Sequence, residues 1–432
     1  MNKCLSRKIE FLGGWRAALI RLKFIISSGK HIFQRKKYPL FRLRPSIGGL
    51  LSALQVLNDL NLKKIVKFNN SYYFSLTTPR WPSSPFSRMT ARGGLNIKAA
   101  GTPLKSQIDI AILAITRKCN YDCKHCYEHF NLADEDIVPV ERWKKIIEDI
   151  QKIGANIIAL SGGEPMLRYD GLIEMLESGN KSLSEFHIYT SGHRVTAEKA
   201  RELNEAGISA SAIGLDDVIP QRHDDLRGFK GSYQEALQAI RYFQEARVFT
   251  YINLCLTKDL ICSGDLPKYF ELAKELNVGA IRFLEPKPCG GYLFEDRGEL
   301  FSEEDRRIVT EFFMEANRAK KYRDYPLISY EDYAEAPERL GCMMGGHTHF
   351  HIDSLGNVEP CVFLPISFGN IMEEDFLDIY KRMKEAIPAP LHKLCPSIYL
   401  AEKIRDRRNN GEALPVPYRD IETEWQQMLE ET

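Results

Sequence analysis

The chain has 432 residues, of which 44% are hydrophobic and 27% charged, a composition typical of globular proteins that excludes disordered and fibrous classes. Its ten cysteines are too sparse for a secreted disulfide scaffold, and no run of about 18 uncharged apolar residues could cross a membrane. The net charge of +1 is unevenly divided, because residues 1–105 carry 20 Lys and Arg but only Glu10 and Asp59, whereas 106–432 carry 39 basic and 56 acidic residues.

A basic amphipathic helix over residues 11–33 is the first predicted element. Its large apolar side chains fall on one helical stripe and its basic side chains on another face. Such a helix is typical of segments in the headgroup region of an anionic membrane, for which the polybasic residues 34–44 would be a second signal. The alternatives are packing on its own domain, a peptide leader, or nucleic acid, which is not favoured. The stripe comprises Trp15, Leu19, Leu22 and Ile26.

A second helix is predicted over 50–60, followed by two β-rich runs joined by Asn69, Asn70 and Ser71, which predict a hairpin. The order helix, helix, hairpin is that of a small winged-helix-like module. Pro, Ser and Gly break every periodicity over 77–94, so this stretch is interpreted as a linker. We therefore expect a basic N-terminal α+β module over residues 1–105 of a cytoplasmic protein, with peripheral attachment to the inner face of the membrane.

From Ile108 onward the chain alternates apolar runs with amphipathic helical stretches, the signature of a parallel sheet or barrel. The sequence thus predicts an α/β fold, a partial (β/α)6 TIM-like barrel over 106–290. In such barrels the side chains just after each strand face the mouth of the active site. The six apolar runs span residues 108–116, 155–161, 186–191, 208–216, 249–257 and 278–286.

Three cysteines with two short spacings follow the first predicted strand, namely Cys119, Cys123 and Cys126. Three thiolates from one loop can hold a [4Fe–4S] cluster and leave one iron open to another ligand. The alternative is a zinc knuckle, but structural zinc sites take four ligands in two clustered pairs. The pattern therefore favours the iron–sulfur cluster.

A glycine-rich turn follows the second predicted strand. Gly162 and Gly163 let a ligand approach the backbone, and Pro165 fixes the turn ahead of the next helix. Glu164 could accept hydrogen bonds from an ammonium group. One β/α unit after the cysteine triplet, this turn predicts a ligand site at the mouth of the barrel.

Through CxxxCxxC at 119–126, GGEP at 162–165 and six β/α units, the sequence resembles the radical S-adenosylmethionine (radical SAM) superfamily over about 108–290. The resemblance implies that S-adenosylmethionine binds the open iron. An electron, supplied by a partner such as flavodoxin or ferredoxin, would then release methionine and a 5′-deoxyadenosyl radical, which abstracts hydrogen from a substrate. By family position the cysteines are ligands, Tyr127 lies against the adenine, and Gly162, Gly163 and Glu164 hold the methionine amino end.

The stretch 213–232 resembles the fourth-strand region of that family. Arg227 is the candidate partner of the methionine carboxylate, and a purely structural ion pair is the alternative. Gly214 stands where the family commonly has a serine. The ribose contact expected from that serine side chain is therefore in doubt here.

The region 291–432 resembles the small SPASM/Twitch type of C-terminal Fe–S extension, through Cys342, Gly356, Cys361 and Cys395. The cysteine-dense run of a two-cluster SPASM domain is missing, so the resemblance implies a single auxiliary [4Fe–4S] cluster with these three cysteines as ligands. The fourth ligand is either Cys289 or a substrate at an open iron.

His347, His349 and His351 alternate, so a strand would project them from one face. They could ligate a metal or supply a base near neutral pH, although a histidine is more often structural. His351 is the candidate catalytic residue.

The chain is therefore interpreted as a radical SAM enzyme, an oxidoreductase or transformase. The basic front module favours a lipid or membrane-associated small molecule as the substrate. The alternatives are a peptide or protein maturase, whose front module would grip an acidic leader, and a non-catalytic Fe–S electron carrier, against which the GGEP turn argues.

Overall fold

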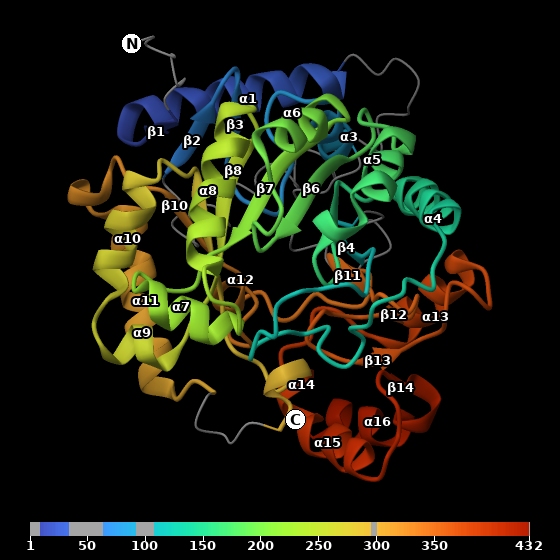
Figure 1. Cartoon of the computed structure of the whole chain (residues 1–432). Coiled ribbons are helices and arrows are strands. Elements are labelled where there is room, and N and C mark those ends of the chain that lie inside the picture. The colour runs from blue at the N-terminus through green and yellow to red at the C-terminus, as the bar shows by residue number, and fades with distance from the viewer. Residues whose placement is uncertain (1–8, 34–63, 92–107, 295–299, 432) are drawn as a thin grey trace.

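The computed structural model describes residues 9–33, 64–91, 108–294 and 300–431, with the backbone alone for 24–33 (Figure 1). Its largest feature is a nine-stranded sheet in the order β10-β9-β8-β7-β6-β5-β4-β11-β12. All neighbours pair in parallel except β11 and β12. Six of these strands confirm the predicted repeat: β4 (Ile110–Ala114), β5 (Ile157–Ser161), β6 (Glu185–Thr190), β7 (Ile208–Gly214), β8 (Phe249–Cys255) and β9 (Ala280–Leu284).

Further strands extend the repeat at both edges. At one edge β10 (Leu327–Tyr330) adds to β9, and at the other β11 (His349–Ile352) adds to β4 and carries β12 (Val358–Glu359). The sequence pattern did not predict these strands, because each is short and β11 contains two histidines among its four residues. They form because the edges of the barrel present unpaired backbone groups that a nearby segment can satisfy.

Amphipathic helices cover the outer face of the sheet (Figure 1). Helix α4 (Val140–Ile153) confirms a predicted stretch and buries Trp143, Ile146, Ile147 and Ile150 completely. Burial of each such side chain contributes about 1.5–3 kcal/mol. The other helices of this layer are α5 (Tyr169–Ser178), α6 (Ala197–Glu205), α7 (Pro220–Arg227), α8 (Ser232–Glu245), α9 (Lys258–Cys262), α10 (Leu266–Glu275) and α11 (Glu303–Arg318).

The front module contains a three-stranded antiparallel sheet. Strand β1 (Glu10–Leu12) pairs with β2 (Ile65–Phe68), which forms the predicted hairpin with β3 (Ser71–Tyr73). Helix α1 (Gly14–Phe33) thus starts three residues later than the periodicity indicated, because Glu10–Leu12 is drawn into the sheet. The helix predicted over 50–60 lies outside the described residues.

The stretch interpreted as a linker differs from that expectation, because it contains helix α3 (Ser84–Ala91). The Ser83 hydroxyl accepts a hydrogen bond from the backbone N–H of Phe86 at 3.1 Å, and Pro85 lies in the first turn. Serine and proline are favourable at a helix start, so the composition that resembled a linker here begins a helix. Phe86 and Met89 are buried.

The front module closes the amino ends of the barrel strands. Tyr73 stacks on Phe249, the first residue of β8, with ring centroids 3.7 Å apart. Lys64 is buried and donates to four backbone carbonyls of residues 316, 322, 325 and 326 at 2.9–3.2 Å. Figure 1 shows this module at one end of the barrel and helices α15 and α16 at the opposite end. The carboxyl ends of the strands therefore face the C-terminal region.

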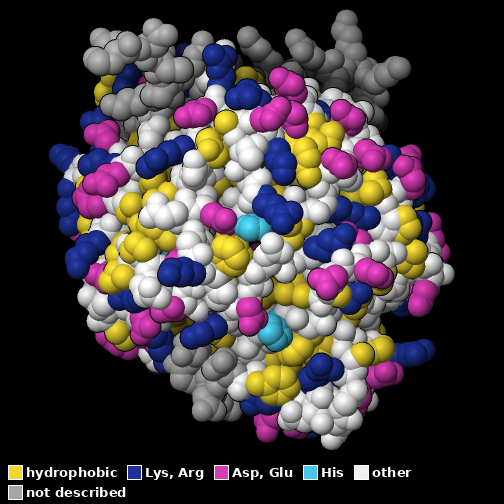
Figure 2. Space-filling view, viewed as in Figure 1, with side chains coloured by type: hydrophobic (Ala, Val, Ile, Leu, Met, Phe, Trp, Pro, Cys, Tyr) yellow, Lys and Arg dark blue, Asp and Glu magenta, His cyan; other side chains and the backbone are white. Residues whose placement is uncertain are grey.

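The C-terminal region contains one two-stranded sheet, β13 (Ile366–Ser367) with β14 (Val416–Pro417), among its described residues. Acidic and basic side chains are interspersed over the face of the molecule in Figure 2. In the described part of the chain, no helix is both long and apolar enough to span a membrane. The helices of the C-terminal region that follow α11 are α12 (Glu331–Ala334), α13 (Phe376–Ala386), α14 (Pro396–Tyr399), α15 (Ala401–Asn409) and α16 (Glu422–Glu430).

Candidate active site

A cavity of about 1370 Å3 lies inside the barrel and extends past the carboxyl ends of its strands. It is lined by barrel, front-module and C-terminal residues, so all three regions build one chamber. Both groups of cysteines predicted as ligands reach it. These are Cys119, Cys123, Cys126, Cys289, Cys342, Cys361 and Cys395, all free thiols.

The loop that carries the first three cysteines is clamped between two glycine turns. A Cβ on Gly163, after β5, would collide with the carbonyl of Lys118. A Cβ on Gly290, after β9, would collide with the carbonyl of Cys126, and the N–H of Gly291 donates to that carbonyl at 2.9 Å. These positions require glycine because backbone meets backbone there. Contacts within the protein backbone thus fix the position of the loop.

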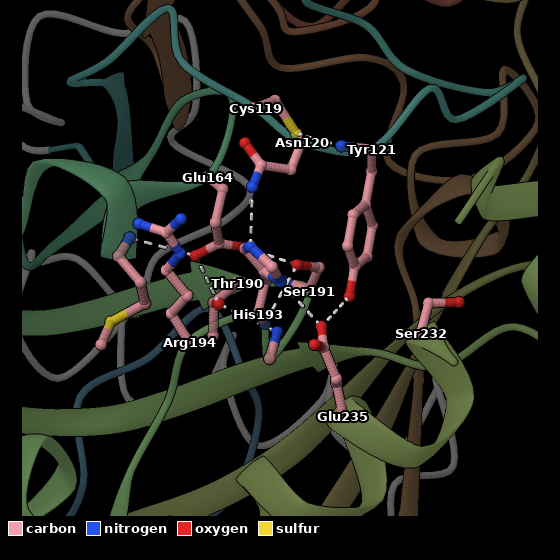
Figure 3. Close-up of polar contacts among 12 residues, drawn as sticks. Cys119, Asn120, Tyr121, Glu164, Thr190, Ser191, His193, Arg194, Ser232 and Glu235 are labelled. Carbon is pink, nitrogen blue, oxygen red and sulfur yellow. Dashed lines mark hydrogen bonds and ion pairs between the residues drawn. The ribbon is translucent and has the colours of Figure 1, made fainter. Parts of the chain in front are cut away.

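The side chain of Glu164 points toward Thr190 and Ser191 at the end of β6 (Figure 3) and does not itself line the cavity. One carboxylate oxygen accepts from the Thr190 hydroxyl at 2.7 Å and from the N–H of Met166 at 3.1 Å. The other accepts from the N–H and hydroxyl of Ser191 at 2.9 and 2.6 Å. Glu164 therefore positions the turn, and the surface presented to the cavity is that of Gly162 and Gly163.

A second polar network holds the cysteine loop from the side (Figure 3). Glu235 on α8 lies 2.8 Å from Nδ1 of His193 and accepts from the Tyr121 hydroxyl at 2.5 Å. Nε2 of His193 lies 3.0 Å from the side-chain amide of Asn120. Asn120 and Tyr121 directly follow Cys119, so this network fixes the position of that cysteine.

Arg227 lines the cavity and forms a buried ion pair with Asp216, with Nε 2.7 Å from the carboxylate. Burial raises the pKa of Asp216, but the charge and hydrogen bond of Arg227, together with the nearby His125 and His223, outweigh it and lower the net pKa to about 2. The structural alternative considered for Arg227 is thus present, and its place on the cavity wall leaves it available to a ligand as well.

The second cysteine group lies where the C-terminal region meets the barrel. Cys342 pairs with Leu391 through two backbone hydrogen bonds of 2.8 Å, which brings it close to the segment of Cys395. Cys395 stands directly before α14. Cys289 follows β9 and shares this part of the wall. The tertiary structure thus assembles four thiols, those of Cys289, Cys342, Cys361 and Cys395, from a stretch of more than 100 residues.

Two family models match the regions that build this chamber. Residues 113–260 match the radical SAM superfamily, and residues 342–397 match SPASM, an iron–sulfur cluster-binding domain. The chain belongs to the radical SAM superfamily. It is an enzyme of that superfamily, with a [4Fe–4S] cluster, S-adenosylmethionine and an auxiliary iron–sulfur cluster as cofactors.

The relatives of this radical SAM enzyme carry names that refer to different kinds of molecule. An AdoMet-dependent heme synthase of Methanosarcina barkeri is 28% identical over 62% of this chain and 80% of its own. A PqqA peptide cyclase of Gluconobacter oxydans is 23% identical over 62% of this chain and 74% of its own. The crystal structure of Streptococcus suis SuiB bound to precursor peptide SuiA shares the fold, with a TM-score of 0.52, 18% identity, and coverage of 68% and 69% of the two chains.

The cysteine loop of the radical SAM domain fits a cluster. Burial raises the pKa of the Cys119 thiol to about 12 and that of Cys126 well above its ordinary value, so the thiolates need bound metal ions to form. No three His, Cys, Asp or Glu side chains of the described residues converge on a single ion. The thiolates of a four-iron cluster bind different irons and need not converge. When bound, the cluster supplies the electron that cleaves S-adenosylmethionine.

Tyr127 lies on the cavity wall, and its hydroxyl is 2.7 Å from that of Ser161, at the end of β5. His351, the candidate catalytic residue, is buried behind this wall and lies 2.9 Å from Glu128. His349 is the member of the histidine group that lines the cavity. The alternation correctly predicted that both side chains project from one face of β11, but it did not reveal that His351 pairs with Glu128.

Several polar residues inside the barrel escaped the sequence analysis. Asn253 on β8 and Arg282 on β9 are register partners and line the cavity, as does Glu331 after β10. The sequence did contain a signal for Asn253 and Arg282, because each interrupts an apolar run at an inward-facing position of its strand. A polar side chain inside a barrel strand is a candidate binding residue, because its burial without a hydrogen-bond partner is costly.

Proposed function

We propose that this enzyme abstracts hydrogen from a peptide segment that enters the chamber between its two iron–sulfur groups. The observation that carries the proposal is the single cavity of about 1370 Å3, which both cysteine groups line. That volume exceeds the ~300–1,000 Å3 typical of a pocket for one small molecule, so it has room for S-adenosylmethionine together with part of a substrate.

Unpartnered polar atoms inside the barrel support a substrate with both hydrogen-bond donors and acceptors. Among the described residues, Nε of Arg282, Oε2 of Glu331 and Oδ1 of Asn253 are buried without a hydrogen-bond partner. Arg282 is 6% exposed, and its Nε lies 3.5 Å from the other Glu331 oxygen. One donor beside two acceptors complements a peptide amide, which carries an acceptor C=O and a donor N–H. An acyl chain would leave all three unsatisfied.

The names of the relatives also favour a peptide, through the PqqA peptide cyclase and SuiB with its precursor peptide. The heme synthase makes a small carboxylate-bearing metabolite the second candidate, because Arg282 would suit a carboxylate. The lipid substrate preferred from the sequence has no such support. Reduction of the cluster would come from a flavodoxin or ferredoxin.

The front module is proposed to contact an anionic membrane surface independently of the substrate. On α1, Trp15, Leu19 and Leu22 are 70%, 47% and 52% exposed, so these three residues of the predicted stripe face solvent rather than the barrel. Arg16 and Lys23 beside it are also exposed, and α1 contains no acidic residue. Apolar and basic side chains together are the requirement for binding in a headgroup layer.

The substrate proposal is tested anaerobically with protein reconstituted with iron and sulfide, reduced by dithionite and supplied with S-adenosylmethionine. Cys123→Ala is the control for 5′-deoxyadenosine formation. An extract of the source organism grown in deuterated medium is separated into peptide, lipid and small-metabolite fractions, and deuterium in 5′-deoxyadenosine is measured by mass spectrometry. Transfer from the peptide fraction alone supports the proposal. Transfer from the lipid or metabolite fraction instead would refute the peptide assignment.

A further inference from the structure

The C-terminal tail, residues 416–431, lies beyond the SPASM match, which ends at residue 397. It contains strand β14 and helix α16. Trp425 and Met428 of α16 are 0% and 3% exposed, so this helix is packed on the rest of the C-terminal region. The indole N–H of Trp425 donates to the carbonyl of Ala386, the last residue of α13, at 3.3 Å. The tail is thus an ordered part of the fold.

The beginning of the tail is joined to the backbone segment that carries Cys361. Strand β14 pairs in parallel with β13, with Val416 opposite Ile366. The N–H of Val416 also donates to the carbonyl of Pro365 at 2.9 Å. Strand β13 follows Cys361 closely, and the carbonyl of Cys361 accepts from the N–H of Leu364 at 3.1 Å. The pairing of the two strands therefore holds the backbone next to this cysteine.

The end of the tail is joined to the segment of Cys395, on both sides of that cysteine. The ammonium group of Lys393, just before it, donates to the carbonyls of residues 428 and 429 in the last turn of α16. The last carbonyls of a helix have no partner within the helix, so a cationic donor is favoured there. The hydroxyl of Tyr399, which ends α14, donates to the Glu431 carboxylate at 2.5 Å.

The tail therefore links two separate segments of the second cysteine group. The thiols of this group are free and line one wall of the chamber, a donor set that suits an iron–sulfur cluster. The ligands of a metal site must lie at fixed distances, because metal–ligand bond lengths vary little. A tail that holds the Cys361 segment at one end and the Cys395 segment at the other thus fixes the spacing of two ligands.

We propose that the C-terminal tail positions Cys361 and Cys395 for the auxiliary iron–sulfur cluster. Lys393 and Tyr399 are the positioning residues on the cysteine side of this contact. Because they act on the protein backbone and not on a substrate, the inference holds for any substrate of the enzyme. It rests on the assignment of the two cysteines as ligands of the auxiliary cluster. The radical SAM cluster is held by the separate loop 119–126 and should not depend on the tail.

The test compares the wild type with the double variant Lys393→Met and Tyr399→Phe, each reconstituted anaerobically with iron and sulfide. After reduction by dithionite, EPR distinguishes the clusters, because only the signal of the radical SAM cluster changes when S-adenosylmethionine is added. The double variant lacks the hydrogen bonds to the tail, so EDTA should remove its auxiliary cluster about tenfold faster, at an unchanged rate for the other cluster. Lys393→Arg keeps a cationic donor and should retain the auxiliary cluster.

The matched control is the pair Lys381→Met and Tyr242→Phe. These side chains carry the same polar groups, but their polar partners, Glu385 and Gln238, lie on their own helices α13 and α8. The control should therefore retain both clusters as the wild type does. Cys395→Ala removes a ligand and should lose the auxiliary signal.

Unchanged retention of the auxiliary cluster in the double variant would overturn the inference. Equally fast loss of both clusters, or the same loss in the control pair, would overturn it too, because the contacts would then support the whole fold. If the double variant does not fold, Tyr399→Phe, which removes a single oxygen, decides in the same assay. An auxiliary signal that survives in Cys395→Ala would refute the ligand assignment on which the inference rests, whereas the proposed peptide substrate would stand.

Discussion

Replacing His351 by alanine is predicted to destabilise the protein rather than to remove a catalytic base. His351 and Glu128 are 0% and 1% exposed, and Nε2 lies 2.9 Å from Oε1. Nδ1 lies 3.1 Å from the carbonyl of Ile112, which can only accept, so Nδ1 carries a hydrogen. Nε2 lies opposite a carboxylate oxygen of Glu128, and a hydrogen bond between these two atoms requires a second proton between them. Ser354 and Asn131 donate to the other Glu128 oxygen.

The magnitude follows from what the substitution leaves behind. Burial raises the pKa of Glu128, but its hydrogen bonds and the His351 charge lower it further, so the net pKa is below its usual value and the carboxylate is ionised at neutral pH. Removal of one partner from a buried pair costs about 3–5 kcal/mol. Since each kcal/mol lowers Tm by about 2–4 °C in a domain of 150–250 residues, His351→Ala should lose roughly 6–20 °C.

The assay is urea unfolding of the metal-free protein, followed by tryptophan fluorescence, for His351→Ala, Glu128→Gln and the double variant. Because the two side chains share one pair, the double variant should be less destabilised than the sum of the single variants by about 1–3 kcal/mol. The exposed His392, replaced by alanine, is the matched control. The reasoning is refuted if His351→Ala unfolds at the wild-type urea concentration while hydrogen abstraction stops and cleavage of S-adenosylmethionine continues.

Three other variants give sharp outcomes. Gly163→Ala should reduce iron bound per chain at least severalfold, because its Cβ collides with the Lys118 carbonyl that precedes Cys119; iron and sulfide analysis measures this. Replacing Trp15, Leu19 and Leu22 by serine should abolish flotation with vesicles rich in anionic lipid without lowering Tm, because these side chains are exposed. Asp216→Asn should lower the free energy of unfolding by about 2 kcal/mol at pH 7, because the pKa of Asp216 is depressed from 3.8 to about 2 in the folded protein. The difference in stability between variant and wild type should vanish as the pH falls from 4 to 2, because Asp216 of the wild type then becomes protonated.

Each of these has a matched comparison. Gly231→Ala introduces a Cβ where nothing lies within 4 Å, although this glycine is in the left-handed region, and should retain iron. Met372 and Leu377, also exposed, can be replaced by serine as the control for flotation. Binding of neither the wild type nor the variant to anionic vesicles would contradict the proposed membrane surface. A difference between Asp216→Asn and wild type that persists at pH 2 would contradict the ion-pair account.

The comparison of the cysteine loop with the histidine group shows where sequence analysis reached its limit. CxxxCxxC confines three thiols to eight residues, so any fold of the loop keeps them near one another, and their role could be inferred. His349 and His351 also alternate as a strand requires, and both project from one face of β11. His351 is nevertheless buried against Glu128, and no local pattern encodes that contact, because the two residues are 223 positions apart in the sequence.

The sequence by itself determined the six central strands, their helices and the cofactor class, because periodicities of 2 and 3.6 residues and short motifs are local properties of the chain. Only the tertiary structure decided that Cys342, Cys361 and Cys395 share a cavity with the first cysteine group. It also decided that the Glu164 carboxylate hydrogen bonds to Thr190 and Ser191 and does not line that cavity. Contacts between segments far apart in the sequence set these features, and such contacts depend on which buried groups find partners once the whole chain has folded.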